Sequence, residues 1–274
     1  MTGAALTLRV RSVGSSAARA LAVRGPAGRI FEATTTAALV AAFERACYLE
    51  HAGTLVAAVA PELLNGPLNL VVAPPSGVAF TDVPAGAAVA LELHGATIWP
   101  AQLHPFDPPA LPAALARLTV IERVLRDAPP ESLAGRQPAK PLEELADALR
   151  RGDDALLRQA AGRLAGRGPG LTPSGDDALV GAMTALTMIR GGGAARLRRA
   201  IARSAVGRTT RLSAAYLKAA SRGEAGEAWH RLRDALAEGS AGQVEEAARG
   251  VMAFGETSGA DMLAGFVLAF PAAA

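Results

Sequence analysis

The pattern of hydrophobic and polar positions changes about a hundred residues into the chain. From Leu6 to about Trp99, short apolar runs rich in valine and leucine alternate with glycine, proline and asparagine, which is typical of strands and turns. The segment Thr36 to Leu49 fits either a helix or a strand, and we favour a strand across its second half because Glu50-His51-Ala52-Gly53 resembles a hairpin turn. The other predicted strands are Leu6–Val13, Arg29–Ala33, Thr54–Ala60, Leu68–Val72 and Ala88–His94.

After the proline-rich connection Pro100 to Pro112, helical periodicity dominates. Gly191-Gly192-Gly193 predicts a helix end followed by a tight connection. The fold class is therefore α+β, with a β-rich N-terminal part (1–110) packed on a C-terminal helical bundle (111–274). The predicted helices are Pro112–Asp127, Leu142–Arg150, Asp153–Leu164, Gly175–Ile189, Ala194–Val206, Thr210–Ser221, Glu224–Ala237, Gln243–Phe254 and Ser258–Phe270.

Composition excludes several classes of protein. Aromatic residues make up only 4% of the 274 residues and the formal charge is only +3, so we expect no nucleic-acid partner. The single cysteine, Cys47, allows no internal disulfide and fits a reducing compartment. Residues 1–11 lack the pattern of a secretory signal, and the most apolar helices are too short to span a membrane. We therefore expect a soluble, cytoplasmic protein without a membrane partner.

The segment Gly166 to Asp177 is the most informative motif, because a loop rich in glycine and proline leads directly into an apolar helix. A helix start carries unpaired amide donors and partial positive charge, so it can bind an anion. Ser174 is the expected N-cap, with Asp177 three residues further on. The predicted ligand-binding residues of this segment are Gly168, Gly170, Thr172, Ser174 and Gly175.

The same pattern returns near the C-terminus. Ser174-Gly175-Asp176-Asp177-Ala178-Leu179-Val180-Gly181 aligns with Ser258-Gly259-Ala260-Asp261-Met262-Leu263-Ala264-Gly265, matching serine, glycine, aspartate, leucine and glycine. We predict two related helix starts that converge on one site, with Gly181 and Gly265 allowing close packing. Thr257, Ser258 and Gly259 are the predicted ligand-binding residues of the second copy.

Asp176, Asp177 and Asp261 are the predicted catalytic residues. They could instead hold a magnesium ion through oxygen ligands, or only stabilise the helix starts. Arg208, Thr209, Thr210 and Arg211 form a further predicted ligand-binding segment, since guanidinium groups grip carboxylate or phosphate. The four histidines show no zinc spacing, and no protein-bound metal and no organic cofactor is expected, magnesium remaining the alternative.

These motifs resemble a bacterial family that includes the AllH subunit of oxamate carbamoyltransferase. The similarity rests on Gly168 to Asp177, Arg208 to Ser213 and Thr257 to Asp261, and in the N-terminal half only on Asn65 to Leu70. Glu256 stands where that family often has histidine, so no histidine role is carried over. The resemblance implies transfer of a carbamoyl group between carbamoyl phosphate and oxamate, within a hetero-oligomeric complex active in allantoin degradation, a branch of purine catabolism.

Three functions stay open at this point. The chain is a carbamoyltransferase subunit that binds a small anionic ligand, a noncatalytic assembly subunit, or a magnesium-dependent phosphate-ester hydrolase. The first requires the two serine-led helix starts to meet, and the third requires two aspartates at one cation.

Overall fold

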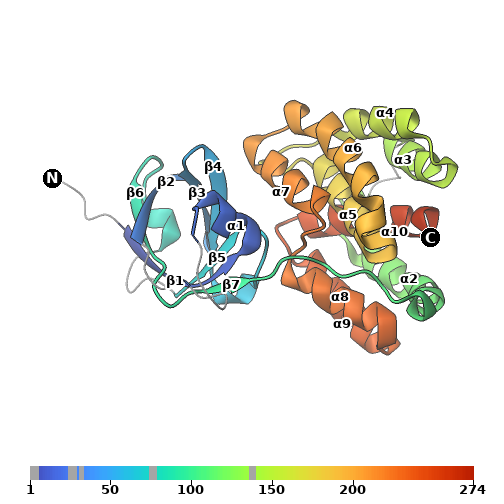
Figure 1. Cartoon of the computed structure of the whole chain (residues 1–274), viewed down its shortest axis with the longest axis horizontal. Helices are drawn as coiled ribbons and strands as arrows, with labels where there is room; N and C mark the ends of the chain where they lie inside the picture. The colour runs from blue at the N-terminus through green and yellow to red at the C-terminus, as the bar shows by residue number, and fades with distance from the viewer. Residues whose placement is uncertain (1–5, 24–29, 31–33, 74–78, 136–139) are drawn as a thin grey trace. The chain divides into compact units, whose positions relative to one another are not determined.

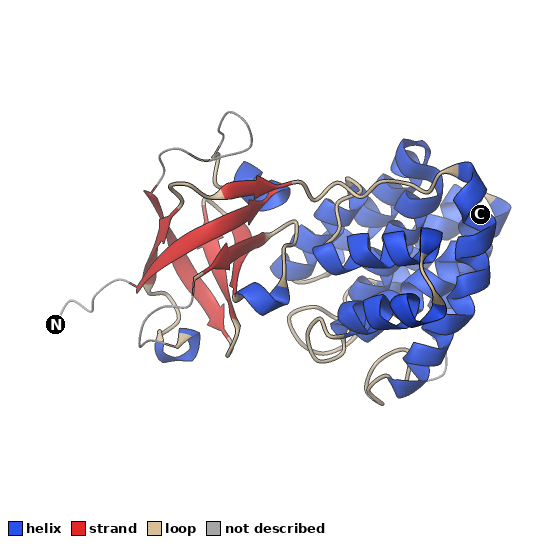
Figure 2. Ribbon diagram, turned by 90° about the horizontal axis from the view of Figure 1, so that it is seen from below, coloured by secondary structure: helices blue, strands red, loops and turns tan. Residues whose placement is uncertain are grey.

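The computed structural model describes residues 6–23, 30, 34–73, 79–135 and 140–274. It divides into two compact units, Met1–Ala101 and Gln102–Ala274 (Figure 1). The first is built mainly of strands and the second of helices (Figure 2). The predicted α+β class, with a β-rich N-terminal part and a C-terminal helical bundle, is confirmed.

The first unit is a closed sheet. Its strand order is β5-β4-β3-β2-β6-β1-β7, and an antiparallel pairing of β1 with β5 closes the first six of these strands into a ring. Alternate side chains such as Leu8, Val10, Leu49 and Leu91 point inwards and form its core. The strands are β1 (Leu6–Gly14), β2 (Thr34–Ala42), β3 (Ala46–His51), β4 (Thr54–Val59), β5 (Asn69–Val72), β6 (Ala88–Glu92) and β7 (Thr97–Trp99).

Four predicted strands are confirmed as β1, β4, β5 and β6. The ambiguous segment 36–49 is strand in both halves, because β2 and β3 form one antiparallel hairpin. The predicted strand Arg29–Ala33 lies outside the described residues except for Ile30, whose amide donates to the carbonyl of Ala96 at 2.9 Å. The short helix α1 (Ser15–Ala20) and the strand β7 were not predicted.

In the second unit all nine predicted helices are confirmed within a few residues, among the residues that the structure describes. The predicted helix end and tight connection at Gly191 to Gly193 are confirmed, since Gly191 is the C-cap of α5 and the short 3-10 helix η6 (Gly191–Ala194) leads directly into the next helix. The helices are α2 (Leu111–Val124), α3 (Lys140–Arg151), α4 (Asp154–Leu164), α5 (Ser174–Arg190), α6 (Ala195–Ala205), α7 (Arg211–Ser221), α8 (Glu227–Glu238), α9 (Ala241–Met252) and α10 (Ser258–Ala273).

Helices α5 and α10 form the centre of this bundle. α10 packs on α5, α3, α9 and α2, while α5 also packs on α7, α6 and α4. Every residue of α5 from Gly175 to Met188 is buried. The helical stretch Ser174–Arg208 is long and apolar enough to cross a membrane, and it is longer than the apolar helix predicted from the sequence. However, 72% of its most apolar window is buried inside the protein. Its apolar character is therefore that of a core helix.

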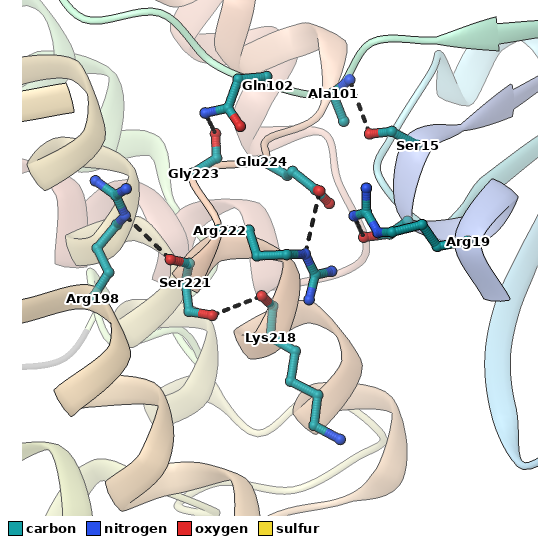
Figure 3. A network of polar contacts seen from close by, with 11 residues as sticks. Ser15, Arg19, Ala101, Gln102, Arg198, Lys218, Ser221, Arg222, Gly223 and Glu224 are labelled. Atoms are coloured by element: carbon teal, nitrogen blue, oxygen red, sulfur yellow. Dashed lines mark hydrogen bonds and ion pairs between the residues drawn. The ribbon is translucent and has the colours of Figure 1, made fainter. Parts of the chain in front are cut away.

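A buried arginine ties the ends of two helices together near this core. Arg198 of α6 donates to the carbonyl of Gly191 at 2.7 Å and to the carbonyl of Ser221 at 3.4 Å (Figure 3). These carbonyls end α5 and α7, where the helix dipole favours a cation. Burial lowers the pKa of this guanidinium, although it stays charged because an arginine side chain loses its proton only far above neutral pH. Arg198 thus ties the C-terminal ends of α5 and α7 together.

Candidate functional site

The starts of α5 and α10 meet in the helical unit. The hydroxyl of Thr172, in the loop before α5, lies 2.9 Å from the hydroxyl of Ser258, the first residue of α10. These residues are 86 positions apart in the chain. The predicted convergence of the two serine-led segments is therefore present in the structure.

The two segments are also built alike. Ser174 and Ser258 are the first residues of their helices, each followed by a buried glycine. The amide of Gly175 donates to the carbonyl of Arg167 at 2.9 Å, and the amide of Gly259 donates to the carbonyl of Phe254 at 2.8 Å. A methyl group on Gly175 would lie 2.1 Å from the carbonyl oxygen of Leu164, at the end of α4.

The second copy repeats this last contact. A methyl group on Gly259 would lie 2.2 Å from the carbonyl oxygen of Val251, near the end of α9. In each copy a preceding helix thus ends against the glycine that opens the next helix. The two helix starts are therefore alike in their first residues and in the contact that their glycine makes.

A second pair of glycines lets the two central helices cross closely. A methyl group on Gly181 would lie 1.8 Å from the carbonyl oxygen of Met262, and one on Gly265 would lie 2.0 Å from that of Ala178. The alignment pairs Gly181 with Gly265 and Ala178 with Met262, so the contact is reciprocal. The expected close packing through these two glycines is confirmed.

The predicted capping is wrong in one respect. The N-cap of α5 is Pro173, and Ser174 is already the first helical residue with no side-chain cap. Proline fixes its own φ and starts the helix one residue earlier. The amides of Gly175 and Gly259 already donate to loop carbonyls, so the helix starts present fewer free donors than the sequence predicts.

Asp176 joins three segments of the chain. Its side chain is buried and accepts hydrogen bonds from the amide of Gly166, at 3.0 Å, and from the hydroxyl of Thr209. Burial raises the pKa of this carboxyl, while the hydroxyls of Thr209 and Ser213 and the Gly166 amide lower it. Ser213 was not among the predicted site residues. Asp176 thus holds the glycine-rich loop and residue 209 against α5.

Asp177 lies deepest between the helix starts and is 2% exposed. Burial raises the pKa of its carboxyl well above the usual value, and the charges of Asp261 and Asp176 raise it further. The hydroxyls of Ser258 and Thr172 lower that pKa, so both lie beside the carboxyl. Its Oδ2 atom is buried and accepts no hydrogen bond from the described residues.

Asp261 occupies the equivalent position of α10 and is fully buried. Its Oδ1 atom accepts a hydrogen bond of 2.5 Å from the backbone amide of Leu133. Leu133 follows the turn Pro129 to Ser132, where the Ser132 hydroxyl donates to the carbonyl of Pro129 at 2.6 Å. This turn was not predicted as part of the site, because a backbone amide leaves no signal in the sequence.

The loop before α5 is exposed from Gly166 to Leu171. Gly168 has a φ of +119° and Gly170 a φ of +87°, a conformation that other residues rarely adopt. Leu171 is 43% exposed, which is unusual for a large apolar side chain, while Thr172 and Ser174 are half-buried. Thr257, also half-buried, is the N-cap of α10 and accepts from the amide of Asp261 at 2.9 Å.

The segment 208–211 contacts the same loop. The hydroxyl of Thr210 caps α7 through the Ser213 amide at 3.1 Å and donates to the carbonyl of Leu171 at 2.5 Å. Arg208 is exposed, and its guanidinium lies beside Gly162 of α4. A methyl group added to Gly162 would lie 3.9 Å from the guanidinium. Arg211 is exposed at the start of α7. Both threonines thus bind to the motif, whereas the arginines border it.

The carboxyl groups of this region do not form a typical metal centre. Within the described part of the chain, no group of three or more histidine, cysteine, aspartate or glutamate side chains is arranged to hold a metal ion. Two helix N-termini at the same place also disfavour a cation.

Residues 164–270 match the model of a protein family described as oxamate carbamoyltransferase subunit AllH. No curated protein and no solved structure shows a significant match to the chain. The matched range includes both serine-led helix starts and the segment 208–211. The resemblance identified from these motifs is confirmed over this range, which does not include Asn65 to Leu70.

Proposed function

We propose, from the membership of residues 164–270 in the family of oxamate carbamoyltransferase subunit AllH, that this protein is a subunit of a carbamoyltransferase. The reaction moves a carbamoyl group from carbamoyl phosphate to oxamate or a related small anion. With oxamate it gives oxalurate and phosphate. The wider role we propose is allantoin degradation in the cytoplasm, together with partner subunits.

The contact between Thr172 and Ser258 is the observation that carries this proposal. It joins two segments that lie at opposite ends of the matched range, so the range is organised around one place. Both substrates are anions, and the partial positive charge of a helix start favours anions. The same charge favours the negative charge that develops on a carbonyl oxygen during transfer.

Within this site the carboxyl groups have different tasks. Asp176 holds the loop, since both of its oxygens accept hydrogen bonds from the protein. Asp177 is the group we assign to the ligand. The exposed loop 166–171 is the side from which a small anion would enter, because its neighbour Thr172 is only half-buried while Ser258 and Asp177 are buried.

The test is an enzyme assay of the chain together with the subunits that co-purify with it. The complex is expected to release phosphate from carbamoyl phosphate only when oxamate is present, with oxalurate detected by mass spectrometry. A complex that contains every subunit and still makes no carbamoylated product from oxamate or related amides would refute the proposal.

A matched pair of serine variants tests the ligand site of the isolated chain by thermal shift. Ser258→Ala removes a hydroxyl from the motif, whereas Ser240→Ala removes the cap of α9 outside the motif. Because a ligand stabilises only the folded protein that binds it, we expect Ser258→Ala to lose the stabilisation by carbamoyl phosphate or oxamate. Ser240→Ala is expected to melt earlier and to keep the ligand response.

A noncatalytic assembly role is the second candidate. It is supported by the exposed Leu171 at the tip of the motif and by the internal hydrogen bonds of Asp176. A Leu171→Ser variant that no longer forms the complex in sedimentation, in a protein that binds no substrate, would favour this role over catalysis.

A further inference from the structure

Acidic residues are almost absent from a long part of the helical unit. Between Asp154 and Glu224 the chain carries 12 of its 28 lysines and arginines but only 2 of its 25 aspartates and glutamates. These two are Asp176 and Asp177, which are 1% and 2% exposed. The surface formed by this part of the chain is therefore strongly basic, although the whole protein has a formal charge of only +3.

Five exposed arginines of this part form a surface that we call the basic face. None of the five forms an ion pair with a side chain that the structure describes, whereas two neighbouring arginines do, since Arg196 pairs with Asp154 and Arg163 pairs with Glu144. The charges of the basic face are therefore not neutralised by these residues of the protein. The face consists of Arg158 of α4, Arg167 of the following loop, Arg199 and Arg203 of α6, and Arg208 after α6.

The basic face is continuous because α4 and α6 run side by side in the same direction. Near their starts Arg196 pairs with Asp154, and near their ends a methyl group on Gly162 would lie 3.8 Å from the carbonyl oxygen of Ser204. Both helices lie on one side of α5, while α8 and α9 lie on the other (Figure 1). Charges of one sign gathered on one face repel each other, and they attract a surface of the opposite sign.

The other side chains of this surface indicate what kind of anionic surface it fits. Leu156 at the start of α4 is 38% exposed and Leu171 after the loop is 43% exposed, and they are the exposed large apolar side chains of the helical unit as far as it is described. A protein surface offers both carboxylates and apolar side chains, whereas a nucleic acid is bound through phosphates and through aromatic side chains that stack on bases. Eleven of the twelve basic residues are arginines, which bind carboxylates with two hydrogen bonds and are enriched at protein interfaces.

We infer that the basic face is the docking site of a partner subunit that presents a carboxylate-rich surface. The inference rests on the proposed function for the existence of partner subunits, and it deepens that function by naming the surface and its chemistry. Arg167 and Leu171 belong to the loop before α5. The docked partner therefore contacts the exposed border of the candidate site.

Two double variants of the full chain test this inference. Arg199→Glu with Arg203→Glu reverses two charges of the basic face, four residues apart on the exposed side of α6. Arg123→Glu with Arg126→Glu makes the same change of net charge at the end of α2, where both arginines are exposed and form no ion pair with a described side chain. Circular dichroism checks that both variants fold.

Binding to the subunits that co-purify with the wild type is measured by sedimentation at several salt concentrations. We expect the first variant to bind at least about tenfold more weakly, as for other close charge pairs across an interface. Wild-type binding should weaken as the salt concentration rises, because salt screens exposed charges. The α2 variant should bind like the wild type. Poly-glutamate and duplex DNA are the probes for the isolated chain, and we expect poly-glutamate to bind the wild type and to bind the first variant more weakly.

Several results would overturn the inference. A complex that tolerates the reversal on α6, or that is weakened equally by both variants, would show that the basic face is not the interface. Tighter binding of DNA than of poly-glutamate, lost in the first variant, would assign the face to nucleic acid, and oligomers of the chain alone, lost in that variant, would assign it to a second copy. The inference also fails if no subunit co-purifies and poly-glutamate does not bind.

The inference and the proposed function can fail separately. A complex that depends on the basic face and carbamoylates neither oxamate nor related amides would keep the inference and refute the function. An active complex that survives the charge reversal would do the opposite.

Discussion

The start of α5 and the start of α10 are two copies of one design that have been put to different uses. In both, a serine begins the helix and a glycine packs on the preceding helix. They differ at the aspartate, since Asp261 accepts the backbone amide of Leu133 on Oδ1, whereas the carboxyl of Asp177 accepts from the hydroxyls of Ser258 and Thr172. The same position thus binds a distant turn in one copy and the residues of the two helix starts in the other.

The copies also differ in their loops. The loop before α5 is long, rich in glycine and exposed from Gly166 to Leu171, while the loop before α10 runs only from Ala253 to Thr257. Hydrogen bonds hold the longer loop at both ends. The amide of Gly166 donates to the carboxyl of Asp176, and the carbonyl of Leu171 accepts from the hydroxyl of Thr210. Only the α5 copy therefore has a long exposed loop that is held at both ends beside the helix starts.

The largest expected effect comes from breaking the symmetric crossing. Gly181→Ala and Gly265→Ala each place a methyl group about 2 Å from a backbone carbonyl oxygen, where no flexible atom can yield. We expect each to destabilise the protein by about 3 kcal/mol, the upper range for overpacking a core. Chemical denaturation measures this. Gly250→Ala in α9, where nothing lies within 4 Å, is the control and should be neutral or stabilising.

The second effect separates the two aspartates. Asp261→Leu leaves the Leu133 amide without its acceptor, and we expect a loss of about 2 kcal/mol, as for other buried donors left unpaired. Asp177→Leu removes a carboxyl whose donors are the hydroxyls of Ser258 and Thr172, and these can still hydrogen-bond to each other, so we expect a smaller loss. Equal destabilisation by the two variants, in urea denaturation, would show that the copies are used alike.

A smaller difference is expected between the loop glycines. Gly168→Ala forces alanine to a φ of +119° and brings its methyl group 2.7 Å from the amide nitrogen of Ser174. Gly255→Ala needs a φ of +65°, and its nearest contact is 3.4 Å. We expect Gly168→Ala to lower the free energy of unfolding by about 2 kcal/mol, because of backbone strain and a clash. Gly255→Ala is expected to lower it by about 1 kcal/mol, because of strain alone. A reversed order in thermal melts would contradict the described loop geometry.

The smallest effect appears as a trend with pH. Because burial raises the pKa of Asp177 in the folded protein, folding favours the protonated carboxyl. Its contribution to stability is then greatest below about pH 4, the unfolded pKa, and falls as the pH rises towards the folded pKa. The stability of Asp177→Leu relative to the wild type should therefore increase with pH above about 4. A difference that stays constant between pH 4 and pH 8 would show that Asp177 is ionised in both states.

Much of this comparison could be predicted from the sequence. The helices were predicted because their apolar positions recur with a period of about 3.6 residues. The repeated serine, glycine and aspartate predicted that the two helix starts are related, and Gly181 and Gly265 predicted the close crossing. The difference between Asp177 and Asp261 was not predictable, because it depends on the backbone amide of Leu133, 128 positions away.

The β-rich unit shows a similar limit. Its strands were mostly found from short apolar runs, but the pairing of β1 with β5 that closes the ring joins segments far apart in the chain. The segment 36–42 was left open between helix and strand, since Leu39 and Phe43 also fit a helical period. This segment forms strand β2 because its backbone pairs with β3 on one side and with β6 on the other.

The reciprocal glycine crossing has a consequence for how this protein can respond to a guest. Each backbone sits against the carbonyl groups of the other with no side chain between them, so neither helix can slide, roll or tilt without a collision. The two central helices therefore form one rigid contact, and a guest that binds beside their starts meets a backbone that is already fixed before it arrives.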